Sequence, residues 1–440
     1  MSSKDISRAV NEIEPTPTLN CEMLRNGIPR LLAGIVLTLR LPHAWAQTQD
    51  ERSPLDYDPN APLFTFENEV PAARAGSFRV SPSATLATGY DSNVLATDRD
   101  RSADSISVAQ GLVKFTNAST VLQPDGTPAD KWDMTGLGFV RARRFIDTAE
   151  ADTNEFGLGL NFDGRPSSQD QVFGQVAAQR LFESRTEIET PHSLPVSYYN
   201  EYRANLAEEH TFSRLTARAT VGAVRQDFTD FTQDYRNRWS YMGELRGAYE
   251  LHSDLSLLAI GYYNRDDFTV PSALIDSATT VGGLVGTHYE IPEVLDLEFS
   301  GGPFKRRFAG GRGELTGISV RGTLTWQATR LMTIRTQVNR EDQATRVAGV
   351  LGKVRTIVAL QADHTYSPRV SLYGRARVIF DDYDIINRTD ITYIAEAGVN
   401  VLVTRNYVLS FSYDYGSRSS YAVDNRFQRH VAGLSLTRRF

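Results

Sequence analysis

The sequence of 440 residues contains one cysteine, Cys21, which lies upstream of the first apolar run of the chain. A framework of disulfide bonds is therefore excluded, and another constraint has to hold the fold together. A cysteine that carries a lipid anchor would follow the apolar run of an export signal, so we do not expect lipidation at Cys21.

Long hydrophobic runs are also missing. No segment after residue 46 has the roughly 20 apolar residues that a transmembrane helix needs. The mean hydropathy of −0.34 would ordinarily indicate a soluble protein. A membrane β-barrel with a polar lumen has the same average, because its strands alternate apolar residues toward lipid with polar residues toward water.

The sequence lacks a basic excess, since 47 Lys and Arg residues stand against 53 Asp and Glu residues, for a net charge of −6. This balance argues against general nucleic-acid binding, so no nucleic-acid partner is expected. No glycine-rich phosphate loop, zinc spacing or nucleotide fingerprint occurs, and the histidines are scattered along the chain. We therefore expect no cofactor, no metal site and no enzymatic activity.

The first 46 residues are typical of an export signal. Arg25 and Arg30 precede a short apolar run over residues 31–39, and Ala44-Trp45-Ala46 follows it. This order predicts an N-terminal extension and signal peptide over residues 1–46, cleaved after Ala46. The alternative, a membrane anchor, would need a longer run to cross roughly 30 Å of hydrocarbon.

Residues 47–77 are rich in proline and acidic residues, which predicts a flexible periplasmic leader. The alternative is a small plug that folds into the interior of the following domain.

From residue 78 to residue 440 the chain is a series of segments in which apolar and polar residues alternate. Clear examples are residues 239–251, 316–326, 370–380, 391–403 and 407–415. Alternation is typical of β-strands with one apolar face. We predict an all-β fold, a transmembrane antiparallel up-and-down β-barrel of about 18 strands, with 16 within the error of the count.

The connections between these segments alternate between short and long over the C-terminal half. Short connections are expected at residues 252–254, 292–293, 328–330, 367–369 and 404–406, and long ones at 266–277, 303–313, 341–353, 381–388 and 416–426. Outer-membrane barrels sort their connections in this way, with tight periplasmic turns and longer external loops. Pairing the strands in order places both ends of the barrel on the periplasmic side.

The last segment places Ala432, Leu434, Leu436 and Phe440 on one face. A terminal aromatic residue resembles the closing strand of outer-membrane barrels, in which it serves as the signal for the barrel-assembly machinery. Arg438 departs from the apolar residue usual at its position. We expect Phe440 to act as an assembly signal.

The segment Gly89-Tyr90-Asp91-Ser92-Asn93-Val94 resembles the opening motif of a family of β-barrel porins, of the β-barrel porin 2 type. The resemblance covers residues 78–440. It implies an outer-membrane location, a channel-like role connected with exopolysaccharide export, and no catalytic residues. Within the motif, Asp91 and Asn93 would either cap the strand or bind a cation.

By strand alternation, a set of charged residues is expected to line the pore: Arg218, Glu244, Arg246, Arg321, Arg335, Arg355, Asp363, Arg375, Arg377 and Glu396. Two interpretations remain open. Arginines opposite acids would create a transverse field, as at pore constrictions, or they would simply satisfy a polar interior. Tyr373 would stack on sugars if it faces the lumen, or join an aromatic girdle if it faces lipid.

The sequence therefore predicts a porin-like channel in the outer membrane of a Gram-negative bacterium, linked to exopolysaccharide export. The alternatives are a general or solute-selective diffusion porin and a non-conducting structural or receptor barrel. Expected partners are outer-membrane lipids and lipopolysaccharide, the assembly machinery, the polysaccharide and periplasmic export proteins. Two acidic clusters, residues 266–267 and 381–384, are expected in external loops, either solvated or bridging divalent cations.

Overall fold

The computed structural model describes residues 73–75, 78–117, 132–186, 197–270, 277–345, 347, 350–383, 386, 388–422 and 425–440. The chain divides into two units, Met1–Val36 and Leu37–Phe440, and every described residue belongs to the second. The predicted signal peptide and most of the predicted leader therefore lie outside the described residues.

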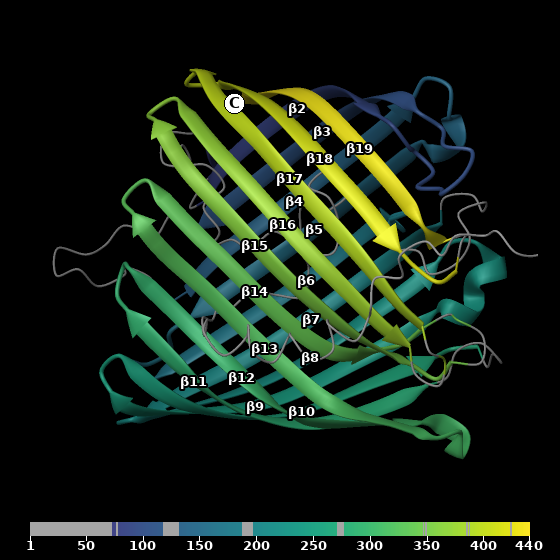
Figure 1. Ribbon diagram of the computed structural model, residues 1–440. Helices are drawn as coiled ribbons and strands as arrows, with labels where there is room; N and C mark the ends of the chain where they lie inside the picture. Colours follow the sequence, from purple (N-terminus) through teal and green to yellow (C-terminus); the bar gives the residue numbers. More distant parts are fainter. Residues whose placement is uncertain are drawn as a thin grey trace, which may run out of the picture. The chain divides into compact units, whose positions relative to one another are not determined.

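In the described residues, nineteen strands form a single sheet, and eighteen of them, all except the short β1 (Ala73–Ala75), close into a barrel (Figure 1). The barrel strands are β2 (Phe78–Asp91), β3 (Asp104–Asn117), β4 (Trp132–Phe145), β5 (Thr153–Gly164), β6 (Asp170–Phe182), β7 (Tyr198–Phe212), β8 (Leu215–Phe228), β9 (Arg238–His252), β10 (Leu255–Phe268), β11 (Ala278–Ile291), β12 (Leu295–Phe308), β13 (Glu314–Thr329), β14 (Met332–Gln343), β15 (Lys353–Ser367), β16 (Val370–Tyr383), β17 (Arg388–Thr404), β18 (Tyr407–Ser419) and β19 (Phe427–Arg439).

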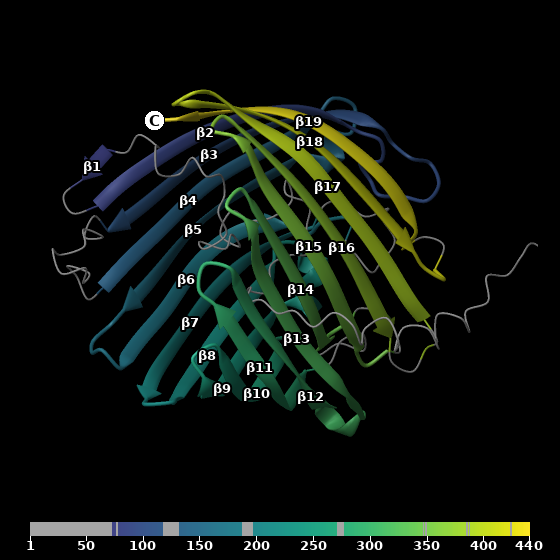
Figure 2. The same ribbon diagram turned by 60° about the vertical axis from the view of Figure 1, so that its left-hand side comes forward.

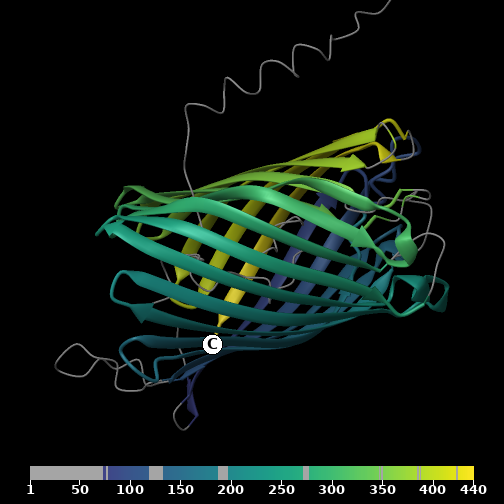
Figure 3. The ribbon, with the colours of Figure 1, turned by 90° about the horizontal axis from the view of Figure 1, so that it is seen from below.

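Each barrel strand is antiparallel to its successor, and β19 pairs with β2 to close the ring. The predicted up-and-down barrel of 18 strands is confirmed. Closure removes the edges of the sheet, which matters in a bilayer because unpaired backbone groups find no water there. The strands run obliquely to the barrel axis (Figure 3), as closure of a sheet requires.

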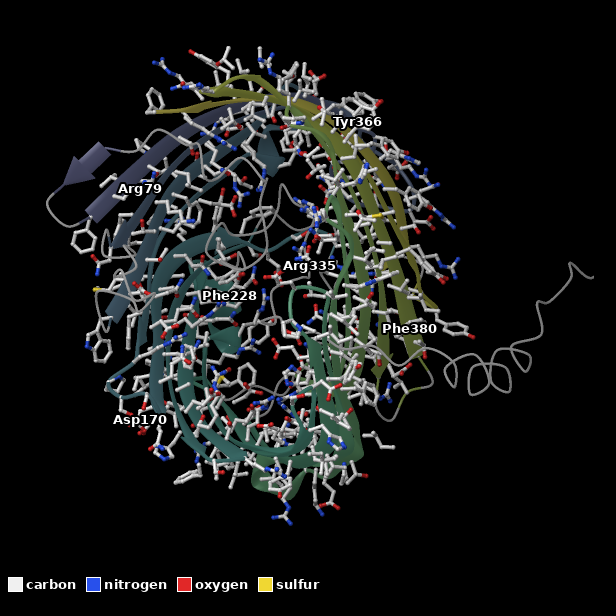
Figure 4. All side chains as sticks on the ribbon, turned by 90° about the vertical axis from the view of Figure 1, so that its left-hand side faces the viewer. Arg79, Asp170, Phe228, Arg335, Tyr366 and Phe380 are labelled. Carbon is white, nitrogen blue, oxygen red and sulfur yellow. The ribbon has the colours of Figure 1, made fainter. Side chains whose placement is uncertain are left out.

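Alternation along each strand separates an outer apolar face from an inner polar one. In β9, Leu245 is 68% exposed, whereas the next residue, Arg246, is 8% exposed. Figure 4 looks along the barrel and shows Arg335 and Phe228 directed into its interior and Phe380 directed away from it. The exposed apolar face is the one that hydrocarbon covers in a membrane barrel.

Aromatic side chains are frequent on the outer face. Trp239 and Tyr241 follow one another there, with ring centroids 6.0 Å apart and nearly parallel planes. Amphipathic rings of this kind are favoured where the apolar band of a barrel meets water.

Short and long connections lie at opposite ends of the barrel in the C-terminal two thirds of the chain. The gaps at residues 213–214, 253–254, 292–294, 330–331, 368–369 and 405–406 are tight turns. The predicted long loops are shorter than expected, because β10, β16 and β18 continue to Phe268, Tyr383 and Ser419. Figure 2 shows the C-terminus and β1 at the end with the tight turns.

In the described parts of the connections at the other end there are short 3₁₀ helices, η4 (Ala149–Ala151), η5 (Phe231–Arg236) and η6 (Ala309–Gly311). In η5, the side chain of Asp230 accepts a hydrogen bond from the backbone N–H of Thr232, which caps the helix. This hydrogen bond to the charged carboxylate is the main cause that lowers the pKa of Asp230.

Strand β1 lies within the predicted leader, residues 47–77. Ala73–Ala75 pairs with Phe78–Val80 at the start of β2. Strand β3 pairs with β2 along its whole length, and β19 pairs with it only from Ser83 onward. Strand β1 therefore occupies the edge of β2 that extends beyond the end of β19.

Among the residues that the structure describes, two apolar clusters line the interior of the barrel in place of a single core. The larger contains Ile260, Tyr262, Ala278, Leu284, Phe304, Phe308, Leu315 and Val354. The smaller joins Phe139 to Leu181. These clusters thicken the wall on β10–β13 and on β4–β6, where they lie beside charged residues of the same strands.

Candidate functional site

All ten predicted pore-lining residues lie on the inner face of the strands. The cross-strand pairs show this directly, because directly opposite residues share a face: Arg375 is opposite Glu396, and Arg218 is opposite Arg246. Arg377 lies two residues beyond Arg375 on the same face and is buried. The strand pattern therefore places these ten residues together, from β8 round to β17.

Three of the predicted arginines pair with carboxylates on their own or the next strand. Arg335 Nη1 lies 2.6 Å from the Asp363 carboxylate, and Arg375 Nη1 lies 3.3 Å from Glu396. Arg355 makes two hydrogen bonds to Asp381, of 2.6 and 2.7 Å. This part of the lumen therefore carries alternating charges rather than a bare positive surface.

Two further ion pairs join strands that are not neighbours. Arg246 of β9 lies 2.7 Å from Glu298 of β12, and Arg321 of β13 lies 2.5 Å from Glu244 of β9. The strands between them present smaller or apolar side chains over which the long charged side chains reach. Strand alternation could predict the face of these residues but not their partners.

Sequence reasoning missed a second charged region in the N-terminal half of the lumen. Arg141 and Arg143 of β4 both bind the carboxylate of Glu155 on β5, at 2.9 and 3.0 Å. On β7, Glu201 accepts hydrogen bonds from Arg203 and Gln179. The same alternation that selected the C-terminal residues applies to these strands and would have found them.

The segment after β6 adds polar groups to the interior from outside the strands. Glu183 binds Arg236 of η5 at 2.6 Å, and the carbonyl oxygen of Thr186 accepts a hydrogen bond from Arg418 of β18. Because β18 lies on another part of the wall, this segment crosses the interior. Arg185 is almost fully buried there, and this burial lowers the pKa of its guanidinium.

Tyr373 lies on the inner face, so it does not belong to a lipid-facing girdle. Its ring covers Gly398 on the neighbouring strand, where a Cβ atom would approach the ring to 2.5 Å. The guanidinium of Arg375 stacks on the ring, 4.8 Å from its centroid. The glycine allows the ring to lie against the wall instead of projecting into the lumen.

The motif Gly89–Val94 forms the end of β2 and the start of the following loop. Asp91 is fully buried and accepts hydrogen bonds from the Arg429 side chain and from the Asn93 backbone N–H. The Asn93 side chain donates to the carbonyl oxygens of Thr97 and Gln428. These contacts support the capping interpretation of Asp91 and Asn93.

The other two motif residues have different roles. Tyr90 is exposed on the outer face, and Gly89 faces inward opposite Gly433, where a Cβ atom would lie 2.5 Å from the carbonyl oxygen of Ala432. Only glycine permits this close approach between the first and last strands of the barrel.

The acidic clusters expected in external loops were placed wrongly. Asp266 lies in β10 and binds Arg306 at 2.9 Å, and Asp381 lies in β16 and binds both Lys353 and Arg355. Both carboxylates form ion pairs with arginine or lysine side chains in the lumen, because β10 and β16 extend further than the loop pattern indicated. Among the residues that the structure describes, no group of three His, Cys, Asp or Glu side chains could hold a metal ion.

Phe440 ends the chain next to the start of the barrel. Its backbone N–H donates to the carbonyl oxygen of Pro82 at 3.0 Å. The guanidinium of Arg438 stacks over the Phe440 ring at 4.4 Å and lies near the Tyr407 ring at 5.9 Å. Arg438 stands where an apolar residue is usual, and it packs with the aromatic rings of Tyr407 and Phe440 on the outer face.

Across the described ranges, no helix is long and apolar enough to cross a bilayer, a finding that concerns helices alone. The closed ring of strands, its apolar outer face and its charged inner face define a porin-like β-barrel. The family described as "Putative beta-barrel porin 2" matches residues 72–440, and the chain belongs to this family. The protein is thus an outer-membrane porin-like barrel, and the family points to a channel rather than an enzyme.

Solved structures of outer-membrane proteins match this chain at low identity. The outer-membrane protein OpdK of Pseudomonas aeruginosa has 11% identity and a TM-score of 0.43, covering 82% of this chain and 99% of its own. OccAB4 of Acinetobacter baumannii has 12% identity and a TM-score of 0.41, covering 82% and 98%. The siderophore receptor PirA of P. aeruginosa has 10% identity and a TM-score of 0.40, covering 84% and 81%. A comparison with curated proteins found no match.

Proposed function

We propose that the barrel is an outer-membrane channel for polar, sugar-like solutes and that it serves exopolysaccharide export. The observation that carries this proposal is the lumen wall on β14–β17, where paired guanidinium and carboxylate groups lie beside the ring of Tyr373. Planar guanidinium groups donate several hydrogen bonds in fixed directions, which suits hydroxyl and carboxylate groups of sugars.

A ring of eighteen strands also favours conduction. Such a barrel encloses more space than its own side chains fill, so water is expected in the lumen. The alternating charges would hold a passing polar chain by exchangeable hydrogen bonds, without the tight binding that a single unpaired charge would give.

The export role rests on the family resemblance and on the position of the chain ends. We place the rim with the tight turns, β1 and Phe440 in the periplasm, where export proteins could meet it. Lipids and lipopolysaccharide would contact the outer face, and the assembly machinery would read the terminal strand.

Conductance and flux test the proposal. Purified barrel in planar bilayers should give ion channels, and in proteoliposomes it should pass neutral and acidic oligosaccharides. A host strain that lacks the gene should retain polymer in the cell envelope. Absence of conductance in a folded barrel would reject the channel, whereas conductance with unchanged polymer secretion would reject the export role and leave a diffusion porin.

A second function, a non-conducting structural or receptor barrel, is favoured by the segment from Glu183 to Thr186, which crosses the interior and contacts Arg418. If this segment blocks the lumen, replacing Arg418 with methionine should raise conductance. If the leader blocks the lumen, removal of residues 47–72, which leaves β1 in place, should do so.

A further inference from the structure

Strands β13 and β14 stop pairing before they end. Their ladder runs from Thr329 opposite Met332 to Val320 opposite Arg340. Beyond this point, residues 314–319 of β13 remain paired with β12, and residues 341–343 of β14 remain paired with β15. The outer tip of the β14–β15 hairpin, described for residues 341–345 and 350–353, therefore separates from the barrel wall at Arg340.

The separated tip turns inward, as the contacts of Asp342 show. Strand alternation puts Asp342 on the outer face together with Arg340. The Asp342 side chain is nevertheless only 4% exposed, and its carboxylate accepts hydrogen bonds from Thr280 at 2.6 Å and from Arg306 at 2.8 Å. Thr280 and Arg306 belong to the inner face of β11 and β12, so the outer face of the tip packs on the inner face of the wall.

Apolar contacts accompany this ionic contact. Val354, the cross-strand neighbour of Asp342, is buried with Phe308 and Leu315 in the larger inner cluster, and Leu351 packs against the same cluster. Arg306 also binds Asp266 of β10, so it connects the tip to two strands of the wall.

The strands separate near the edge of the bilayer. Outward-facing charges mark this level: Arg340 lies 3.8 Å from Asp382, and Lys305 binds Glu314 at 2.6 Å. Charged side chains on the lipid face are unfavourable at bilayer depth. Backbone groups in hydrocarbon must all be paired, whereas water can satisfy them outside it. The wall can therefore part here without leaving unpaired groups in lipid.

We propose that residues 341–345 and 350–353 form a lid that narrows the external mouth of the lumen, and that the structure shows its closed state. Asp342 acts as the latch, with Thr280 and Arg306 as its partners. In the open state, the β13–β14 ladder would continue in its existing register, with Glu341 opposite Ser319 and Asp342 opposite Ile318. Backbone hydrogen bonds of that extended ladder would then replace the latch contacts.

This inference rests on the proposed channel function, and single-channel recording tests it. In the full chain carrying Cys21→Ser, the substitution Asp342→Ala should raise the mean conductance or open time at least two-fold. The double substitution Thr280→Cys with Asp342→Cys should hold the low conductance when oxidised and release it under a reductant. The matched control, Asp382→Ala on the outer face, should behave as the unsubstituted chain.

The outcomes separate the lid from the channel. If the barrel conducts, and neither Asp342→Ala nor the oxidised cysteine pair changes the current, the lid is overturned. If no variant conducts, the channel proposal fails, and labelling of Val354→Cys by a maleimide decides the lid. If the cysteine at position 354 is protected from the maleimide and this protection is lost when Arg306→Met is added, the latch is supported. Equal labelling with and without Arg306→Met overturns it.

Discussion

Asp91 and Arg429 form a buried ion pair that joins β2 to β19, the two strands at which the barrel closes. The guanidinium donates to both carboxylate oxygens, with distances between 2.7 and 3.1 Å, and the Asp91 side chain is fully buried. Asn93, of the same Gly-Tyr-Asp-Ser-Asn-Val motif, donates hydrogen bonds from its side chain to the carbonyl oxygens of Thr97 and Gln428. It therefore connects the loop after β2 to β19.

Removal of one partner of this pair should weaken the barrel strongly. Asp91→Ala leaves the Arg429 charge buried without its carboxylate, which typically costs about 3 to 5 kcal/mol of unfolding free energy. The measurement is urea unfolding in lipid vesicles. The matched control, Asp267→Ala, removes an exposed partner of Arg265 and should cost about 1 kcal/mol or less. Equal losses in the two variants would contradict a special role of the seam.

Phe440 should matter more for assembly in cells than for the stability of the folded barrel. Its ring is partly exposed and contacts Arg438 on the surface, so Phe440→Ala removes little buried area. We expect a lower yield of heat-modifiable barrel in cells and nearly normal refolding in detergent. Similar yields of the two proteins in cells would argue against the assembly-signal interpretation.

Reversal of charge at two lumen positions should alter ion selectivity. Arg375→Glu with Arg377→Glu places new carboxylates beside Glu396 and removes the partner of that residue. Because charges in a confined pore are weakly screened, reversal potentials in planar bilayers should shift toward cations. Arg330→Glu, in a tight turn, serves as the control. A folded, conducting variant with unchanged selectivity would assign these arginines a structural role only.

The contact between Tyr373 and Gly398 predicts a steric effect. In Gly398→Val, the new Cβ would meet the Tyr373 ring at 2.5 Å, so the ring has to turn into the lumen. We expect lower single-channel conductance and a stability loss of about 1 to 3 kcal/mol from overpacking. Gly374→Val on the outer face, where a Cβ atom meets nothing within 4 Å, should leave conductance unchanged. A normal current in Gly398→Val would show that the ring has another place to go.

The export signal predicts a mature chain that begins near Gln47 and resides in the outer membrane. The basis is the Ala44-Trp45-Ala46 site after a short apolar run. N-terminal sequencing of protein from fractionated membranes measures both properties. An intact N-terminus, or a product in the soluble periplasmic fraction, would contradict the prediction.

The sequence was sufficient to predict the faces of the strands but not the contacts made across the lumen. Alternation has a period of two residues, so it assigned Arg321 and Glu244 correctly to the inner face. It could not predict that they meet, because that contact depends on the curvature of the three strands between them, β10 to β12. Loop lengths were overestimated because acidic residues at strand ends, such as Asp381, have the sequence pattern of a solvated turn. In the structure Asp381 lies in a strand and pairs with Arg355 in the lumen.

Alternation also fails where a strand leaves the wall. Asp342 has the sequence position of an outward-facing residue, and only the separation of β14 from β13 brings it to Arg306. No local pattern marks this point, because the end of the ladder depends on packing between distant segments.

The order of the strands has a kinetic consequence. Every pairing in the barrel joins successive strands except the pairing of β19 with β2, which includes a contact between Thr85 and Thr437, 352 residues apart in sequence. Hairpins can form early, since short loops close quickly, whereas the last pairing has to wait for the whole chain. Until then the sheet has two open edges that can bind other chains. We therefore expect substitutions at the seam to slow the final step of assembly and to increase aggregation of open sheets, while equally destabilising substitutions elsewhere mainly speed up unfolding.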